Sequence, residues 1–556
     1  MTGIEAFLEI LASTGVDHIF GNPGTTELPL NDALTGDDRF RYILGIQEIP
    51  VVAAADGFAQ ASGKPGVVNV HITCGLGNSM GMLYNAHCEG TPLLLTAGQQ
   101  DRRLMMEEPV LSGDLISVVR PWTKWAHEVI RVEDIPTATR RAIRIAQTPP
   151  TGPVFLSLPL DVQLEQRPHF DVSVPNSSGC HTRPTQEDLQ RAADILASAK
   201  NPAILAGSRV TEAAAVDDLV SMAELLGAVV ITESASSHGR LPFPPDHPLF
   251  VGGLPLWSHD VQELLSGHDV LFVVGMNLFR QYIHFDTSPI PANTTILHLD
   301  NNPRELSKNY NAEVNLLGNP RSGLQELQKL LTPRLSETFQ QSAQQRTEQA
   351  NREQVKRRQE LRQKAEAESN QRPMTPLTLM SAIARTLPAN AAVIEEAVTT
   401  TNNVLEKLGA IKDPTGYFAH RGWALGWGLG CALGVKLAWP DRPVLALLGE
   451  GSSLYGIQGL WTAARYNIPV TLIICNNSQY QILKVCAGVL PLPHMAAGKY
   501  VGMDLDQPEI DFVKLANSFG VDAQRITEPD ELADRLSTAY QRDRPILLDV
   551  PIAGNS

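Results

Sequence analysis

Short apolar runs alternate with longer amphipathic stretches through the first 180 residues of the chain. The short runs are typical of strands buried on both faces, whereas the longer stretches repeat their apolar residues at helical spacing. Residues 3–14 predict a first helix. The predicted strands are VDHIF, RYILGI, GVVNVHI and PLLLTAG, and the helices between them are VVAAADGFAQASG and SMGMLYNAHCEG. This alternation predicts a parallel sheet with helices on both faces.

Two further blocks of the same kind follow. Residues 181–334 alternate helices such as EDLQRAADILASA with strands such as PAILAG, DVLFVVG and TTILHLD. Residues 335–373 are rich in charge and glutamine, and predict a solvated helix that joins domains. Residues 374–556 form the last block. The predicted fold class is therefore α/β, with three doubly wound parallel-sheet domains: 1–180, 181–334 and, after the charged linker, 374–556.

The last block contains the most informative stretch, residues 444–477. An apolar run, 444–448, predicts a buried strand and ends in Gly449-Glu450-Gly451-Ser452-Ser453. A helical stretch follows, and a second buried strand, 470–475, leads into Asn476-Asn477. Polar groups thus follow two neighbouring strands at their carboxyl ends, where open α/β sheets bind ligands.

The residue types in this stretch suit a phosphate and a hard cation. Gly449 and Gly451 allow a sharp turn and close approach to a ligand. Ser452 and the first amides of the helix suit phosphate oxygens. Glu450 and Asn477 offer the oxygen ligands that Mg²⁺ takes when it bridges to a phosphate. An ordinary glycine turn remains the alternative on these residues alone.

Composition narrows the class of protein. The formal net charge of −15 argues against a nucleic-acid binder. No apolar run reaches the roughly 18 residues that a membrane span needs. The N-terminal stretch lacks a basic region and a cleavage site, so we do not expect a signal peptide. The six cysteines form no CxxC pair, which favours reduced thiols in a cytoplasmic protein. The central block lacks GxGxxG after PAILAG, so nicotinamide binding is weakly supported.

The spacing of the motif makes a resemblance specific. The segment Ser452 to Cys475, 24 residues long, separates Gly451 from Asn476. Gly-Asp-Gly, this interval and Asn-Asn resemble the signature of thiamine diphosphate (ThDP) enzymes, although this chain has Glu450 in place of the aspartate. The segments FGNPGTTELP, GIQEIPVVAAADGFAQASGKPGVVNVH and GLGNSMGML resemble the pyrimidine-binding domain of ThDP-dependent 2-oxoacid decarboxylases. The resemblance covers nearly the whole chain, is closest to the benzoylformate decarboxylases and is more distant to the acetolactate synthases.

The resemblance implies a set of catalytic residues in the first block. Glu48 would be the glutamate that hydrogen-bonds the aminopyrimidine ring and activates the cofactor. The alternative role for Glu48 is that of a helix-capping carboxylate. His71 would transfer protons, since histidine titrates near neutrality. Thr25 would hold the substrate carboxylate, and otherwise is part of a turn or N-cap. His284 would supply a second histidine, or else is a surface loop residue.

The resemblance also implies the contacts of the cofactor and the metal. Mg²⁺ would be bound by Glu450, Asn477 and the carbonyl of Gln479. Residues expected to hold ThDP are Thr399, Thr400, the Trp423 carbonyl, Leu425, Gly449, Gly451, Ser452, Asn477 and Tyr480. The alternatives are a Thr N-cap for Thr399 and Thr400, and a core aromatic for Trp423. Arg421 is expected to be a salt-bridged structural arginine rather than a substrate-binding one.

Leu483 and Cys486 would line the substrate pocket. Cys486 stands where benzoylformate decarboxylases have a phenylalanine, so the pocket is expected to be larger there. The predicted activity is ThDP- and Mg²⁺-dependent decarboxylation of a 2-oxoacid to an aldehyde, with carboligation of aldehydes as a further activity. The alternatives are a carboligase or lyase of the acetolactate synthase or benzaldehyde lyase type, and a catalytically weak homologue. The expected assembly is a homodimer or homotetramer with the active site at the subunit interface.

Overall fold

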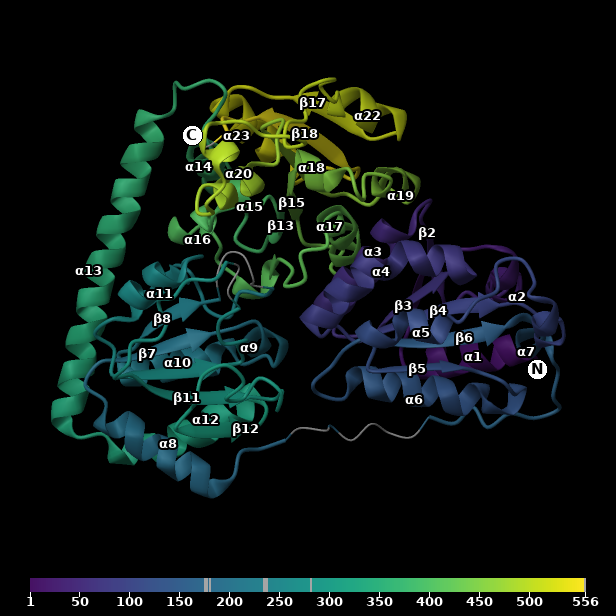
Figure 1. Ribbon diagram of the computed structural model, residues 1–556, viewed down its shortest axis with the longest axis horizontal. Coiled ribbons are helices and arrows are strands. Elements are labelled where there is room, and N and C mark those ends of the chain that lie inside the picture. The colour runs from purple at the N-terminus through teal and green to yellow at the C-terminus, as the bar shows by residue number, and fades with distance from the viewer. Residues whose placement is uncertain (175–178, 180–181, 234–238, 281–282, 555–556) are drawn as a thin grey trace. The chain divides into compact units, whose positions relative to one another are not determined.

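A computed structural model describes residues 1–556, except 175–178, 180–181, 234–238, 281–282 and 555–556. The chain forms two compact units. The first unit contains 1–179, 422–526 and 538–550, and the second contains 180–421, 527–537 and 551–556. The structure contains three six-stranded sheets (Figure 1) whose strand pairs are parallel, which confirms the predicted fold class. Among the described residues, no helix has the length and apolar character needed to cross a membrane.

The first sheet lies in the first unit and has the strand order β2-β1-β3-β4-β6-β5. Its strands are β1 (His18–Asn22), β2 (Arg41–Leu44), β3 (Gly66–Val70), β4 (Leu93–Gln99), β5 (Trp125–Glu128) and β6 (Val154–Pro159). The associated helices are α1 (Gly3–Ser13), α2 (Leu28–Thr35), α3 (Glu48–Ser62), α4 (Ile72–Glu89), α5 (Leu115–Val119), α6 (Ile135–Gln147) and α7 (Leu160–Leu164). The apolar faces of α1 and α6 pack into one core with the sheet.

Two of these helices begin earlier than the apolar pattern predicts. Helix α3 begins at Glu48 because the Gln47 side chain caps it by accepting the N–H of Ile49. Helix α4 begins at Ile72, so the glycine-containing segment 73–78, which precedes the predicted helix, is also helical. Gly75 is accommodated in this helix because it lies against Glu48: a Cβ there would be 3.0 Å from the Glu48 Oε1.

The second sheet lies in the second unit and has the order β12-β11-β10-β7-β8-β9. Its strands are β7 (Pro202–Ala206), β8 (Val229–Thr232), β9 (Phe250–Gly253), β10 (Val270–Val274), β11 (Thr295–Asp300) and β12 (Val314–Leu317). Its helices are α8 (Gln186–Ser198), α9 (Arg209–Glu212), α10 (Val216–Leu226), α11 (Ser258–Leu265) and α12 (Pro320–Leu331). Buried leucines and alanines of α8, α10 and α12 pack with strand residues into the core beneath this sheet.

The charged stretch forms one long helix, α13 (Glu337–Ala367), which lies alongside the sheet of the second unit (Figure 1). It is not solvated on every side. Phe339, Ala343 and Ala350 join the core of the second unit. The buried Gln354 amide donates to three backbone carbonyls, including those of His247 and Phe250. A thin apolar edge therefore attaches an otherwise charged helix to that unit.

The third sheet has the order β14-β13-β15-β16-β18-β17. Its strands are β13 (Ala392–Glu396), β14 (Tyr417–Phe418), β15 (Val444–Gly449), β16 (Thr471–Asn476), β17 (Asp522–Arg525) and β18 (Ile546–Pro551). The helices of the last block are α14 (Pro376–Thr386), α15 (Val398–Thr401), α16 (Val404–Lys407), α17 (Trp427–Ala438), α18 (Glu450–Ser453), α19 (Gly459–Arg465), α20 (Gln481–Ala487), α21 (Pro493–Ala496), α22 (Phe512–Ser518) and α23 (Pro529–Ala539).

Within the first unit, α3 and α17 pack with their backbones in close contact. A Cβ at Gly57 would come within 2.5 Å of the Cys431 carbonyl oxygen, and one at Gly434 would overlap the carbonyl of Ala54. Glycine at these two positions lets the helices approach more closely than side chains would allow. The helix that begins with Glu48 is thereby fixed to the helix that follows Leu425.

Candidate active site

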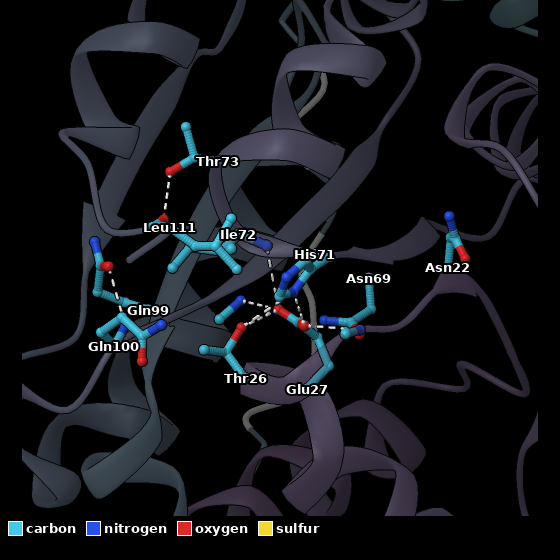
Figure 2. A network of polar contacts seen from close by, with 12 residues as sticks. Asn22, Thr26, Glu27, Asn69, His71, Ile72, Thr73, Gln99, Gln100 and Leu111 are labelled. Atoms are coloured by element: carbon cyan, nitrogen blue, oxygen red, sulfur yellow. Dashed lines mark hydrogen bonds and ion pairs between the residues drawn. The ribbon is translucent and has the colours of Figure 1, made fainter. Parts of the chain in front are cut away.

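Polar side chains gather at the carboxyl edge of the first sheet. Asn22 ends β1, His71 directly follows β3, and Glu48 begins the helix after β2. Strands β1, β2 and β3 are parallel neighbours, so their carboxyl ends lie at one edge. Figure 2 shows part of this network.

Glu48 is buried, with 5% of its surface exposed, and both of its carboxylate oxygens are bound. Oε1 accepts the side-chain N–H of Asn22 at 2.9 Å, and Oε2 accepts that of Asn78 at 3.0 Å. The capping residue of α3 is Gln47, so the carboxylate does not act as the helix cap. The two amides fix the orientation of the carboxylate, whose predicted role toward a pyrimidine ring stays a prediction.

His71 lies between β3 and α4, with its side chain 20% exposed. Its Nδ1 lies 2.7 Å from Oε2 of Glu27, a residue whose side chain the sequence analysis did not single out. The residue after His71, Ile72, has a φ of +20°, which is unusual for a β-branched side chain. Glu27 was present in the motif FGNPGTTELP, but contact with a histidine 44 positions away has no local signal.

Thr25 begins a short 3₁₀ turn, Thr25–Glu27, and its side chain is exposed. The capping position of that turn is held by Gly24, not by Thr25. The neighbouring Thr26 is buried and donates its hydroxyl to Glu27 at 2.9 Å. Thr25 therefore presents a hydroxyl group at the same sheet edge as His71, where its predicted contact with a substrate carboxylate remains to be tested.

The glycine-rich segment after β15 also lies in the first unit. Glu450 begins α18 and is 4% exposed. The backbone N–H of Gln479 donates to Glu450 Oε1 at 2.9 Å and also lies 3.1 Å from Asn477 Oδ1. The Glu450 carboxylate and the Asn477 amide oxygen thus lie beside each other and share the N–H of Gln479 as a donor. Burial raises the pKa of the Glu450 carboxyl, against the lowering effect of the backbone hydrogen bonds. A carboxylate and an amide oxygen are ligands that suit a divalent cation that prefers oxygen.

The rest of this segment is held tightly in place. A Cβ at Gly451 would lie 2.6 Å from the Tyr480 ring, so the glycine leaves room for that ring. The Ser452 hydroxyl donates to the carbonyl of Gly449 at 3.0 Å. Asn476, beside Asn477, donates to Asp549 at 3.0 Å and accepts the N–H of Ser478. Asp549 is a supporting residue that the sequence analysis did not identify.

The loop before α17 is fixed by Asn85 of α4. Its Oδ1 accepts the N–H of Ala424 at 3.0 Å, and its Nδ2 donates to the Ala424 carbonyl at 2.8 Å. Trp423 and Leu425, the predicted cofactor contacts, flank this residue and are partly exposed; Trp423 has a φ of +66°. Trp427 is fully buried and donates its indole N–H to Asp56 at 2.7 Å.

In the second unit, Thr399 and Thr400 lie on α15, directly after β13. Arg421 is buried and forms an ion pair with Glu212 at 2.6 Å, as expected of a structural arginine. His284 has an 86% exposed side chain and lies 3.4 Å from Asp286. The structure therefore shows His284 at the surface of this unit, and its predicted role has no geometric support within the unit itself.

Leu483 and Cys486 lie on α20 in the first unit. Leu483 is 42% exposed, whereas Cys486 is buried, and burial raises the pKa of its thiol. The cysteines among the described residues are all free thiols; Cys180 lies outside the described residues. Two helical side chains that differ in exposure are consistent with one edge of a pocket, but their contact with a substrate stays a prediction.

Comparison with known families gives three matches that together follow the order of the chain. The N-terminal TPP binding domain of thiamine pyrophosphate enzymes matches residues 1–113, the central domain 189–327 and the C-terminal TPP binding domain 397–550. Thiamine pyrophosphate is another name for ThDP.

Individual relatives match over nearly the whole length. Benzoylformate decarboxylase of Pseudomonas aeruginosa is 35% identical, over 98% of both chains. A probable acetolactate synthase large subunit of Methanocaldococcus jannaschii is 29% identical, over 99% of this chain and 92% of its own. Among solved structures, the ThDP-dependent 4-hydroxybenzoylformate decarboxylase of Rhodococcus jostii RHA1 has a TM-score of 0.86 at 29% identity, covering all of both chains. Benzoylformate decarboxylase of Polynucleobacter necessarius has a TM-score of 0.87 at 30% identity, covering 100% of this chain and 99% of its own. These matches confirm the resemblance found in the sequence, and the chain belongs to the thiamine pyrophosphate enzyme family.

Proposed function

We propose that this protein is a ThDP-dependent decarboxylase that converts a 2-oxoacid, benzoylformate-like or aliphatic, into an aldehyde and CO₂, and that it also joins aldehydes to 2-hydroxyketones. The observation that carries the proposal is the carboxylate of Glu48, held on both oxygens at the sheet edge that also carries His71. The 35% identity to a benzoylformate decarboxylase over 98% of the chain supports the same reaction class.

When bound, ThDP supplies the carbanion and the electron sink for decarboxylation. Glu48 would hold a proton against the pyrimidine ring, and the two asparagine amides would keep its carboxylate in place for that contact. His71 would deliver and remove protons at the reacting carbon. The Thr25 hydroxyl would donate to the carboxylate of the substrate. His284 is retained as a second candidate histidine, to be tested by His284→Ala.

The segment after β15 would hold the diphosphate and Mg²⁺. Glu450, Asn477 and the Gln479 carbonyl would bind the metal. The Glu450 carboxylate is buried and lies beside the Asn477 amide oxygen, so a cation there would neutralise it. Ser452 and the backbone at Gly449 and Gly451 would contact phosphate oxygens. The remaining proposed cofactor contacts are Thr399, Thr400, Trp423, Leu425, Asn477 and Tyr480.

We further propose a cytoplasmic homodimer or homotetramer in which Glu48 of one protomer and Glu450 of its partner serve one cofactor. We also propose that the chain has three domains, joined by a linker at 335–373. Their boundaries are 1–180, 181–334 and 374–556. Sedimentation tests the assembly: an enzyme that is fully active as a monomer would contradict it.

The central experiment is a substrate screen with the purified, ThDP-loaded enzyme. CO₂ release from at least one member of a 2-oxoacid panel is expected, and Glu48→Gln should remove most of it without changing the fold. Near wild-type turnover in Glu48→Gln would refute the assignment of this residue.

A second candidate function is that of a carboligase or lyase, which the 29% identity to an acetolactate synthase subunit favours. The discriminating measurement compares CO₂ release from 2-oxoacids with aldehyde release from benzoin-like substrates. A protein that binds ThDP but turns over neither 2-oxoacids nor benzoin-like substrates would instead be a catalytically weak homologue. Glu450, which stands in place of the usual aspartate, would be the first residue to test as the cause.

A further inference from the structure

Beneath His71 lies a carboxylate with an unusually complete set of donors. Glu27 is 1% exposed and ends the short turn at the start of α2. Its Oε1 accepts the N–H of Gly98 at 2.7 Å and the hydroxyl of Thr26 at 2.9 Å, with the N–H of Ile72 at 3.4 Å. Its Oε2 accepts the N–H of Gly24 at 3.0 Å and lies 2.7 Å from His71 Nδ1 (Figure 2).

These contacts settle which atom carries the proton between Glu27 and His71. Backbone N–H groups can only donate, so Gly24, Gly98 and Ile72 require an accepting oxygen. A carboxylate has about four acceptor sites, and the donors other than His71 occupy most of them. An acidic proton on Oε1 would face donors, and the four hydrogen bonds donated to the two oxygens favour the charged carboxylate over one that holds the proton toward Nδ1. The proton must therefore lie on His71 Nδ1, and Nε2 is left without it in the neutral ring.

The surrounding backbone leaves no room for another arrangement. A Cβ at Gly24 would overlap the His71 ring. A Cβ at Gly98 would lie 2.7 Å from Oε1 of Glu27 and 2.5 Å from the Thr26 side chain. The two glycines thus bring N–H groups against the carboxylate where side chains would displace it. The imidazole is held on one face by backbone and at Nδ1 by an anion.

We infer that Glu27 is a positioning residue for His71. It fixes the imidazole in the Nδ1–H tautomer, so that Nε2 is the nitrogen that exchanges protons in the reaction. A buried aspartate has this relation to the catalytic histidine of serine proteases, where loss of the charge gives the wrong tautomer. The inference rests on the proposed function for the claim that His71 transfers protons, but the tautomer itself can be measured without turnover.

Glu27→Gln changes the charge while it preserves the size of the side chain. The position of Oε1 faces three donors, so the amide oxygen of the new glutamine should take it. The amide nitrogen would then face His71, and Nδ1 would have to accept a hydrogen bond. This substitution should invert the tautomer, leaving the proton on Nε2.

Nuclear magnetic resonance of full-length protein labelled with ¹⁵N-histidine tests this directly. The His71 signals are identified by their loss in His71→Ala. In the wild type, the neutral ring should show a protonated Nδ1 and an unprotonated Nε2, and Glu27→Gln should reverse the two. Glu27→Asp retains the charge and should retain the wild-type tautomer. A wild-type ring protonated at Nε2, or an unchanged tautomer in Glu27→Gln, would overturn the inference.

Kinetics of the ThDP-loaded enzyme separate positioning from a merely structural role. General acid–base catalysis contributes about 10²–10⁴-fold, so His71→Ala should lower kcat by about 100-fold and Glu27→Gln by about 10- to 100-fold. Residues that act as a unit are not additive, so the double variant should match His71→Ala within about twofold. Glu27→Asp should recover part of the lost rate. An equal further loss in the His71→Ala background would show that Glu27 only supports the fold.

Glu128→Gln is the matched control. Glu128 lies on β5, which β4 and β6 separate from β3 in the same sheet, and it accepts the Ser157 hydroxyl at 2.9 Å and the Gln99 amide N–H at 3.3 Å. Its variant should leave the tautomer and the rate of decarboxylation unchanged. If His71→Ala has a normal rate but Glu27→Gln inverts the tautomer, the proton-transfer role of His71 is refuted and the inference about Glu27 stands. If His71→Ala is inactive but Glu27→Gln leaves the tautomer unchanged, the inference about Glu27 is refuted and the proton-transfer role of His71 stands.

Discussion

Replacing the buried Asp56 by asparagine is predicted to stabilise the protein above neutral pH. Asp56 lies on α3 and accepts the Trp427 indole N–H at 2.7 Å and the Gln60 amide N–H at 3.1 Å. Burial raises the pKa of this carboxyl to about 6 from its ordinary value of 3.8, and Glu89 adds to the rise, although the hydrogen bonds oppose it. The folded state therefore prefers the protonated form more strongly than the unfolded state does.

The difference in the pKa of Asp56 between the folded and unfolded states sets the direction and size of the effect on stability. Below pH 4 the carboxyl is protonated in both states. Between about pH 4 and 6 it ionises first in the unfolded chain, so stability falls as the pH rises, and above pH 6 the loss is complete. A difference of about two pKa units corresponds to about 3 kcal/mol. The stability of the asparagine variant does not depend on pH in this way, but its hydrogen bond from Trp427 is weaker by about 1 kcal/mol because the acceptor is neutral. The new NH₂ group takes the place of the oxygen that accepts from Gln60, so the Gln60 amide has to turn its oxygen toward it.

The expected net result is that Asp56→Asn is more stable than the wild type by about 2 kcal/mol at pH 8 and not more stable at pH 4. Urea unfolding followed by tryptophan fluorescence at both pH values measures the difference. Asp32→Asn, a change at an exposed position on α2, is the control and should show no change of this kind with pH. If Asp56→Asn is the less stable protein at pH 8, the carboxylate is stabilised in its ionised form and the argument from burial is wrong.

Three further predictions concern the cofactor, the substrate and the second unit. Glu450→Asp should retain ThDP better through gel filtration, because the shorter side chain suits the octahedral geometry of Mg²⁺; weaker retention would mean that the loop is fitted to glutamate. Thr25→Ala should raise KM for a 2-oxoacid more than it lowers kcat, as steady-state kinetics will show, and an unchanged KM would exclude contact with the substrate carboxylate. Arg209→Met should destabilise the protein by about 3–5 kcal/mol in urea, because it leaves the buried Asp300, 2.6 Å away, without its cation; a loss below about 1 kcal/mol would show that Asp300 is neutral.

The sequence was sufficient to predict the parallel sheets and the motif at 444–477, because both are local patterns, but β5 and β6 of the first sheet were not predicted. Buried parallel strands are recognisable as short apolar runs, and a glycine turn followed at a fixed interval by Asn476-Asn477 identifies two strand ends in one sheet. The helix start at Ile72 was missed because glycine in a helix is usually unfavourable. Here Gly75 is explained by a contact with Glu48, which no local pattern could indicate.

The supporting contacts of the site could not be predicted for the same reason. Glu27 meets His71 only because β1 and β3 are paired in a register that places Phe20 opposite Val68. The hydrogen bond from Trp427 to Asp56 joins residues 371 positions apart. Register and helix packing fix such pairs, and both are properties of the folded chain.

The close backbone contact between α3 and α17 has a consequence for local unfolding. A layer of side chains between two helices can rearrange while one of them opens, but backbones in contact have no such layer to adjust. The two helices should therefore exchange their amide hydrogens as one cooperative unit, with similar free energies of opening. The segment that begins with Glu48 and the segment that follows Leu425 would then lose protection together, although they are separated by more than half of the chain.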